Sequence, residues 1–133
     1  MYNKPNDFNN NINFKITIIT TTYNSEKTIE TNLESIQSQT LKNIEHIIID
    51  NKSIDKTLSI VKKYPHVNQI ISEHDKGNYD AMNKGINNAS GDIIGFLNSD
   101  DWFYSREIIE EISYAFDQND IDAVYGDLVF VEN

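Results

Sequence analysis

The sequence predicts an α/β fold in which a mainly parallel sheet is flanked by helices. Apolar, β-branched runs of strand length alternate along the chain with segments whose apolar residues recur at helical spacing. Such alternation is typical of β–α–β units, whose right-handed crossovers cover a parallel sheet with helices. The length of 133 residues suits one compact domain. We therefore expect a single domain of this architecture.

The chain changes character at Phe14. Residues 1–13 are polar and rich in Asn, without apolar periodicity, so we expect a flexible N-terminal tail before a domain that spans residues 14–133. The run Lys15–Thr22 is β-branched almost throughout. That composition is typical of a strand buried on both faces, as in the centre of a parallel sheet.

A helix is expected after this first strand. Asn24 or Ser25 is suited to cap its N-terminus. Apolar residues then recur along one helical face, at Ile29, Leu33 and Ile36.

The strand–helix unit then repeats along the chain. An apolar strand is expected at Ile44–Asp50, followed by a helix that ends before Pro65 and has its apolar face at Ile54, Leu58, Val61 and Tyr64. The remaining elements are a short strand at Val67–Ser72, a helix from about Tyr79 to Asn88, a strand within Asp92–Leu97, a helix from about Ser105 to Gln118 and a final strand at Ala123–Val131.

The charge balance argues against a nucleic-acid partner. Acidic residues outnumber basic ones by 21 to 11, and the sequence pI is near 4.5. A phosphate backbone is bound by clustered Lys and Arg, which this chain lacks. The composition, 38% hydrophobic and 24% charged, is that of a folded globular protein.

Cysteine and histidine usage excludes further classes of site. The chain has no cysteine, hence no disulfide, thiolate metal site or cysteine nucleophile. Its three histidines lack the spacing of a zinc site, so we expect no catalytic duty for them. The sequence shows neither a signal peptide nor a run near the roughly 20 apolar residues that cross a membrane. We expect a cytoplasmic protein without a transmembrane segment.

Aspartates gather in the loops that follow the predicted strands. Ligands of open parallel sheets bind at the carboxyl ends of the strands, where these loops meet. Three of the loops carry the six residues Asp50, Asp55, Asp75, Asp80, Asp100 and Asp101. We therefore expect the functional site at this edge of the sheet.

The adjacent pair Asp100 and Asp101 predicts a metal site. The sequence has neither G-x-G-x-x-G after its first strand nor a P-loop, so a bound nucleoside diphosphate would need a cation to neutralise it. Mn²⁺ or Mg²⁺ would serve, because such ions take carboxylate and phosphate oxygens as ligands. The alternative is that one aspartate merely caps the following helix. Trp102, directly behind the pair, is expected to pack into the core rather than stack on a ligand.

Three segments together resemble a known family. They are ITIITTTYN at Ile16–Asn24, HIIIDNKSIDKT at His46–Thr57, and the stretch Glu73–Trp102, which runs into NSDDW. In order and spacing they resemble the inverting family 2 glycosyltransferases, especially those that build bacterial surface polysaccharides. The resemblance covers Lys15 to about Val131 and implies the GT-A fold, which is Rossmann-like.

The resemblance also implies a role for each matched position. Thr21 and Tyr23 would border the nucleotide pocket, and Asp50 with Asn51 would face the base and ribose. The diphosphate and donor sugar would be lined by Lys76, Gly77, Asp80 and Asn83. Asp100 with Asp101 would bind the ribose and the metal ion. Asn51 stands where many members carry a second Asp, which bears on base preference.

The implied function is the metal-dependent, inverting transfer of a sugar from a nucleotide-diphosphate sugar. We expect this donor to be a UDP-sugar. The acceptor would be a glycan or lipid-linked molecule in polysaccharide biosynthesis, reached in the cytoplasm or peripherally at the inner face of the membrane. Family members continue further, so we expect a truncated GT-A domain whose acceptor half is absent. The general base would then be missing too, with Asp127 a weak candidate.

Rival interpretations come from other classes of protein. A non-catalytic nucleotide-sugar-binding module, or an inactive truncated fragment, is the main alternative. A signalling receiver domain is disfavoured, because its acidic pair follows the first strand, where this chain has TTTYN. Loss of an acceptor half would expose apolar surface, so we also hypothesise a homodimer through that face.

Overall fold

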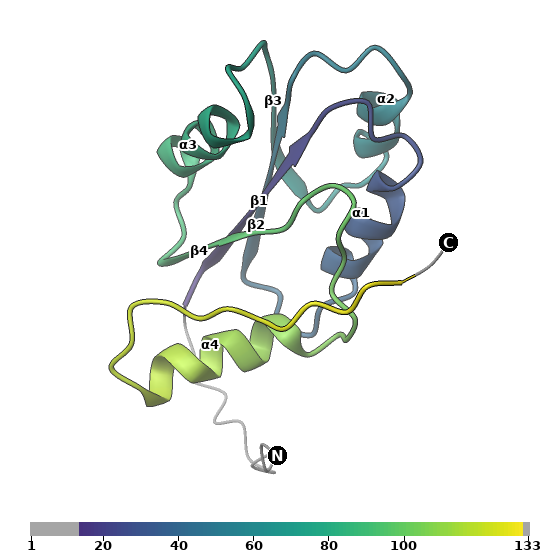
Figure 1. Cartoon of the computed structure of the whole chain (residues 1–133). Coiled ribbons are helices and arrows are strands. Elements are labelled where there is room, and N and C mark those ends of the chain that lie inside the picture. The colour runs from purple at the N-terminus through teal and green to yellow at the C-terminus, as the bar shows by residue number, and fades with distance from the viewer. Residues whose placement is uncertain (1–13, 132–133) are drawn as a thin grey trace.

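The computed structural model describes residues 14–131, so the tail predicted for residues 1–13 lies outside the described residues. Strands and helices alternate along the chain, as Figure 1 shows. They are β1 (Ile16–Thr22), α1 (Ile29–Gln37), β2 (Ile44–Asp50), α2 (Thr57–Val61), β3 (Val67–Ser72), α3 (Asn78–Asn88), β4 (Ile93–Phe96) and α4 (Ile108–Gln118). The four strands form one parallel sheet in the order β3-β2-β1-β4. The predicted α/β fold class is confirmed.

Helices cover both faces of the sheet because β1 and β2 are apolar on both sides. Ile18 of β1 and Ile48 of β2 belong to clusters that α1, α2 and α4 complete on one face. Ile19 and Ile47 pack on the other face against Ala81 of α3. Figure 1 shows α3 on one side of the strands and α1 with α2 on the other. The central strands are buried as predicted, and the loops at their ends are thereby held in fixed positions.

The starts of α1 and α2 differ from the prediction. Neither Asn24 nor Ser25 caps α1, whose cap position is Thr28. Asn24 adopts a left-handed conformation (φ 47°), and its side chain accepts a hydrogen bond from the Ile54 amide at 2.9 Å. Ile54 therefore lies outside α2 and is 90% exposed. Contacts between the two loops, rather than local capping, decide where these helices begin.

The strand predicted at Ala123–Val131 is not formed. This segment has no regular structure, and Tyr125 and Phe130 are 96% and 94% exposed. A strand requires a hydrogen-bonded neighbour, and within residues 14–131 β4 pairs only with β1. β4 is thus an edge strand, with Phe96 43% exposed. None of the helices described is both long and apolar enough to span a membrane.

Candidate functional site

A cavity of about 200 Å³ lies at the carboxyl ends of β1 and β2, beside the start of α3. Four of the residues predicted for the site line it: Thr21, Tyr23, Asn51 and Gly77. Thr22, Asp75, Asn78 and Ala81 complete the wall. The prediction named Asp75 only as one of the aspartates at this edge, and it missed Thr22, Asn78 and Ala81, each of which is adjacent to a predicted residue. Only the folded structure shows that the loops after β1, β2 and β3 line the same cavity.

The polypeptide turns sharply into the cavity at Gly77. Its φ of 116° lies in the region that L side chains rarely adopt, which explains a glycine here. The preceding loop is shaped by its own acids, since Asp75 accepts the Gly77 amide at 2.9 Å and Asp80 accepts the Lys76 amide at 2.9 Å. The N-terminal end of the 11-residue helix α3 thus faces the cavity, an orientation that favours anions.

Asn51 presents a hydrogen-bond donor to this cavity. Its side-chain oxygen accepts the Asp75 amide at 3.1 Å, which fixes the orientation of the side-chain amide. The Nδ2 group makes no hydrogen bond within the described residues and lies at the cavity wall. A ligand acceptor oxygen could pair with it.

Asp50 lies beneath the cavity wall rather than in it. The residue is fully buried, and its carboxylate accepts hydrogen bonds from the Ser53 amide (3.0 Å), the Ser53 hydroxyl and the Ser72 hydroxyl (2.6 Å). These bonds tie the start of the β2 loop to the end of β3. In this structure Asp50 organises the loops around Asn51 instead of facing solvent.

The remaining residues predicted for the diphosphate and sugar lie outside the cavity wall. Lys76 and Asn83 are exposed. Asp80 receives the Lys76 amide and pairs with Lys84 at 3.5 Å, which together hold the pKa of its carboxyl below its usual range. Lys84 also donates to the His74 carbonyl at 2.9 Å, so this small network fixes the loop before α3.

Asp100 and Asp101 differ from the other acids at this edge. Neither carboxylate receives a hydrogen bond or ion pair from any residue in 14–131. Neither caps α4, whose cap position is Glu107, so the capping alternative is wrong. Trp102 is 42% exposed, and Phe103 rather than Trp102 packs against the core, which corrects the expectation for that aromatic.

The acidic pair is adjacent to the cavity through the β1 loop. Ser99, directly before Asp100, makes a hydroxyl–hydroxyl hydrogen bond of 2.8 Å with Ser25, two residues after the cavity residue Tyr23. Across residues 14–131 no group of three or more acids and histidines is placed to hold a metal ion. Two unpaired carboxylates fit an ion such as Mn²⁺ or Mg²⁺ that takes its other ligands from a bound phosphate and water.

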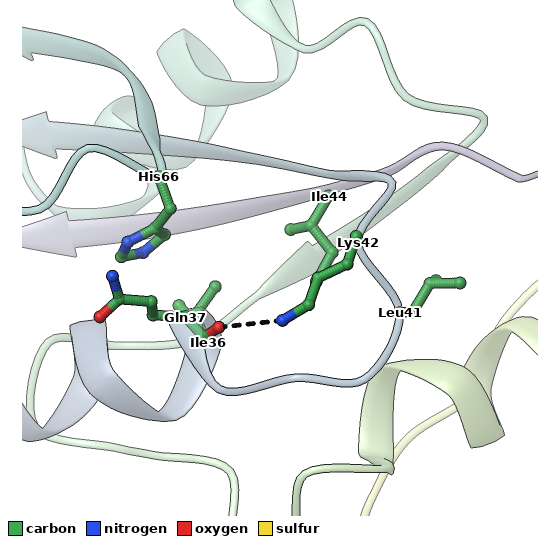
Figure 2. A pocket seen from close by; sticks show the side chains of 6 residues that line it. All are labelled: Ile36, Gln37, Leu41, Lys42, Ile44 and His66. Atoms are coloured by element: carbon green, nitrogen blue, oxygen red, sulfur yellow. Dashed lines mark hydrogen bonds between the residues drawn. The ribbon is translucent and has the colours of Figure 1, made fainter.

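A second, smaller cavity lies at the opposite end of the sheet (Figure 2). It has a volume of about 70 Å³ and is lined by Gln37, Lys42 and His66, together with Ile36, Leu41 and Ile44. His66 stacks on the buried His46 at a centroid distance of 5.3 Å, and burial together with this neighbour lowers the pKa of His46 to about 3. The space is too small for a nucleotide.

Comparison with known proteins agrees with this architecture. The family model for glycosyl transferase family 2 matches residues 17–133. A UDP-Glc:α-D-GlcNAc-diphosphoundecaprenol β-1,3-glucosyltransferase of Escherichia coli, WfgD, is 31% identical over 90% of this chain and 48% of its own length.

Two solved structures share the fold over most of the chain. Staphylococcus aureus TarS, in complex with UDP-GlcNAc, has a TM-score of 0.73 and 31% identity over 78% of this chain and 31% of that one. A Pyrobaculum calidifontis mannosyltransferase, PcManGT, in complex with GDP-Man and Mn²⁺, has a TM-score of 0.67 and 26% identity over 72% of this chain and 30% of that one. The chain spans less than half of the length of WfgD and of other curated relatives, with shares between 16% and 48%.

Proposed function

The chain belongs to glycosyl transferase family 2, and from that premise we propose that it forms the donor-binding part of a metal-dependent, inverting glycosyltransferase. The donor is a nucleoside-diphosphate sugar, with UDP as the leaving group. The acceptor is a glycan or lipid-linked molecule in polysaccharide biosynthesis. The observation that carries the proposal is the free acidic pair Asp100 and Asp101 beside a cavity at the carboxyl edge of the sheet.

The choice of UDP and of a divalent ion rests on the relatives. WfgD is named for UDP-Glc, and TarS has been solved with UDP-GlcNAc. PcManGT has been solved with Mn²⁺, although with a guanine nucleotide. Because the sequence identity is 31% to WfgD and to TarS, against 26% to PcManGT, a uracil nucleotide is better supported than a guanine nucleotide.

In the proposed complex each part of the cavity meets one part of the donor. The Asn51 amide donates to a carbonyl oxygen of the base, and Thr21 with Tyr23 borders the nucleoside. The left-handed turn at Gly77 lets the backbone approach the diphosphate without a side chain in the way. Lys76, Asp80 and Asn83, which lie outside the cavity wall, remain candidates for contacts with the sugar.

The acidic pair would hold the metal ion. When bound, the ion supplies electrostatic stabilisation of the negative charge that develops on the leaving diphosphate. Asp100 and Asp101 are suited to this because neither carboxylate is committed to a contact within residues 14–131. In the reaction an acceptor hydroxyl attacks the anomeric carbon, the carbon–oxygen bond to the diphosphate breaks, and the configuration inverts.

Binding of the donor without transfer is the second candidate function. Inverting transfer requires a carboxylate to take the proton of the acceptor hydroxyl. Asp127, the candidate base, lies in the exposed irregular segment that follows α4. This placement favours a donor-binding module if no other group takes that role.

Calorimetric titration of the chain with UDP, in Mn²⁺ and separately in EDTA, tests the proposal. We expect binding that requires Mn²⁺ and is lost in the Asp100→Ala/Asp101→Ala variant. UDP-sugars should bind under the same conditions, and slow hydrolysis or transfer would separate an enzyme from a binding module. Absence of any Mn²⁺-dependent heat with UDP, GDP and other nucleoside diphosphates would overturn the proposal.

A further inference from the structure

Three polar residues are turned toward the β4–α4 connection: Asn32 and Ser35 of α1, and Gln39, which lies two residues after the end of that helix. Asn32 and Gln39 are 0% and 1% exposed, and the other buried residues of α1 are Ile29, Leu33 and Ile36. A buried amide is costly unless it is hydrogen-bonded. The partners of these side chains therefore explain why they are polar.

Asn32 binds the backbone of the turn Asn98–Asp101, which carries the acidic pair and is called the acidic turn. Its Nδ2 group donates to the carbonyl of Asn98 at 2.9 Å and to the carbonyl of Asp101 at 3.0 Å. The Asp101 amide donates in turn to the Asn98 carbonyl at 3.0 Å, which closes the turn on itself. One side-chain amide thus fixes the backbone at both ends of the segment that contains Ser99, Asp100 and Asp101.

The other two polar residues hold the chain farther along. The Ser35 hydroxyl accepts the Phe103 amide at 3.2 Å. Gln39 donates to the Ser105 carbonyl at 2.8 Å and accepts the Ile109 amide at 3.0 Å. Only Asn32 contacts the backbone of the acidic pair itself.

The side-chain oxygen of Asn32 shows which of its polar atoms matters. Its Oδ1 atom is buried and has no hydrogen-bond partner within the described residues. A buried, unpaired acceptor lowers stability, and an apolar side chain of similar size would avoid that cost. The two donated bonds to the turn are therefore what the asparagine contributes at this position.

We infer that Asn32 is a positioning residue for the acidic pair, fixing the turn so that the Asp100 and Asp101 carboxylates stay together and free for a divalent ion. The inference rests on the proposed function, because it assumes that these carboxylates bind the ion. Without the two donated bonds, the carbonyls of Asn98 and Asp101 must find other partners. The turn then rearranges, and the geometry of the pair is lost.

The variant Asn32→Leu tests this, with Gln39→Leu as the matched control. Both replace a buried amide in or directly after α1 that binds the segment following β4, but Gln39 contacts residues beyond Asn98–Asp101. Mn²⁺ affinity is measured by calorimetry at saturating UDP, and thermal unfolding is followed for each variant. We expect Asn32→Leu to weaken Mn²⁺ binding about 10-fold or more, as loss of a group that orients metal ligands typically does. Gln39→Leu should lower the melting temperature while leaving Mn²⁺ affinity unchanged.

A second variant keeps the test decisive if Asn32→Leu does not fold. Asn32→Asp has nearly the same shape but turns an acceptor toward the two carbonyls, so it should also weaken Mn²⁺ binding. Wild-type Mn²⁺ affinity in a folded Asn32→Leu or Asn32→Asp chain would overturn the inference. If that happens while Asp100→Ala/Asp101→Ala abolishes metal binding, the proposed function stands alone. If the wild-type chain shows no metal-dependent UDP binding, both fail together.

Discussion

The loops after β2 and β4 leave the sheet at the same edge, yet their aspartates are used differently. In the β2 loop, Asp50 accepts hydrogen bonds from Ser53 and Ser72, and Asp55 accepts the Thr57 amide and hydroxyl at 2.9 and 2.6 Å. In the β4 loop, Asp100 and Asp101 accept none from residues 14–131. The carboxylates of the β2 loop hold its structure through hydrogen bonds, whereas those of the β4 loop make no such contact within residues 14–131.

The difference lies in where the hydrogen-bond donors come from. The carboxylates of the β2 loop accept hydrogen bonds from the hydroxyls of Ser53, within the loop, and of Thr57, the first residue of α2. The β4 loop is held through its backbone by Asn32 and Ser35 of α1 and by Gln39, which follows that helix. A loop whose backbone is fixed from outside can keep adjacent like charges without losing its shape. Such a loop is suited to a cation, because the free energy of cation binding is not spent on breaking internal contacts.

Removal of the buried carboxylate should have the largest effect on stability. Asp50→Ala leaves the Ser53 amide and the hydroxyls of Ser53 and Ser72 without their acceptor, which we expect to lower the free energy of unfolding by about 3 kcal/mol. Urea unfolding followed by circular dichroism measures this. Asp50→Asn, which retains one acceptor oxygen, should lose less. Equal stability of Asp50→Ala and the wild type would show that the loop does not depend on Asp50.

Acidification should lower the stability by less, and it should act through His46 of β2. His46 of β2 is buried between Thr20 and His66, and burial together with the His66 charge lowers its pKa from the ordinary histidine value of 6.5 to about 3. The unfolded chain therefore binds a proton between these pH values that the folded chain does not. Stability falls as the pH is lowered through this window, by about 1 kcal/mol between about pH 7 and about pH 5.5.

Urea unfolding at several pH values checks this, with His46→Gln as the comparison. The variant should show a shallower loss of stability on acidification. The loss should not vanish, because burial also lowers the pKa of His66. An identical pH dependence in the variant and the wild type would rule out His46 as the group responsible.

Neutralising the acidic pair should have the smallest effect on stability. Asp100→Asn/Asp101→Asn removes no contact within residues 14–131, so the free energy of unfolding should change by no more than about 0.5 kcal/mol. The same variant should lose Mn²⁺-dependent UDP binding. Destabilisation comparable to that of Asp50→Ala would mean that the acidic pair also carries structural contacts.

The sequence by itself determined four strands of the sheet and the edge at which the cavity of the candidate site lies. Ile16–Thr22 and Ile44–Asp50 are strands as predicted, because continuous β-branched and apolar runs are stable only when covered on both faces. The period of the apolar residues also located α1, α3 and α4. These are properties of short segments, so they can be read without knowing what each segment contacts.

Tertiary structure decided what the individual side chains do. Asp50 ends an apolar strand and Asp100 comes shortly after another, and only the presence of Ser53 and Ser72 around the first makes it structural. Asn32 on the apolar face of α1 was a detectable signal, but its partners lie 66 and 69 residues away. The Ala123–Val131 run has the composition of a strand and no neighbour to pair with among the described residues. Hydrogen-bond partners and strand neighbours are non-local, and therefore only the folded chain specifies them.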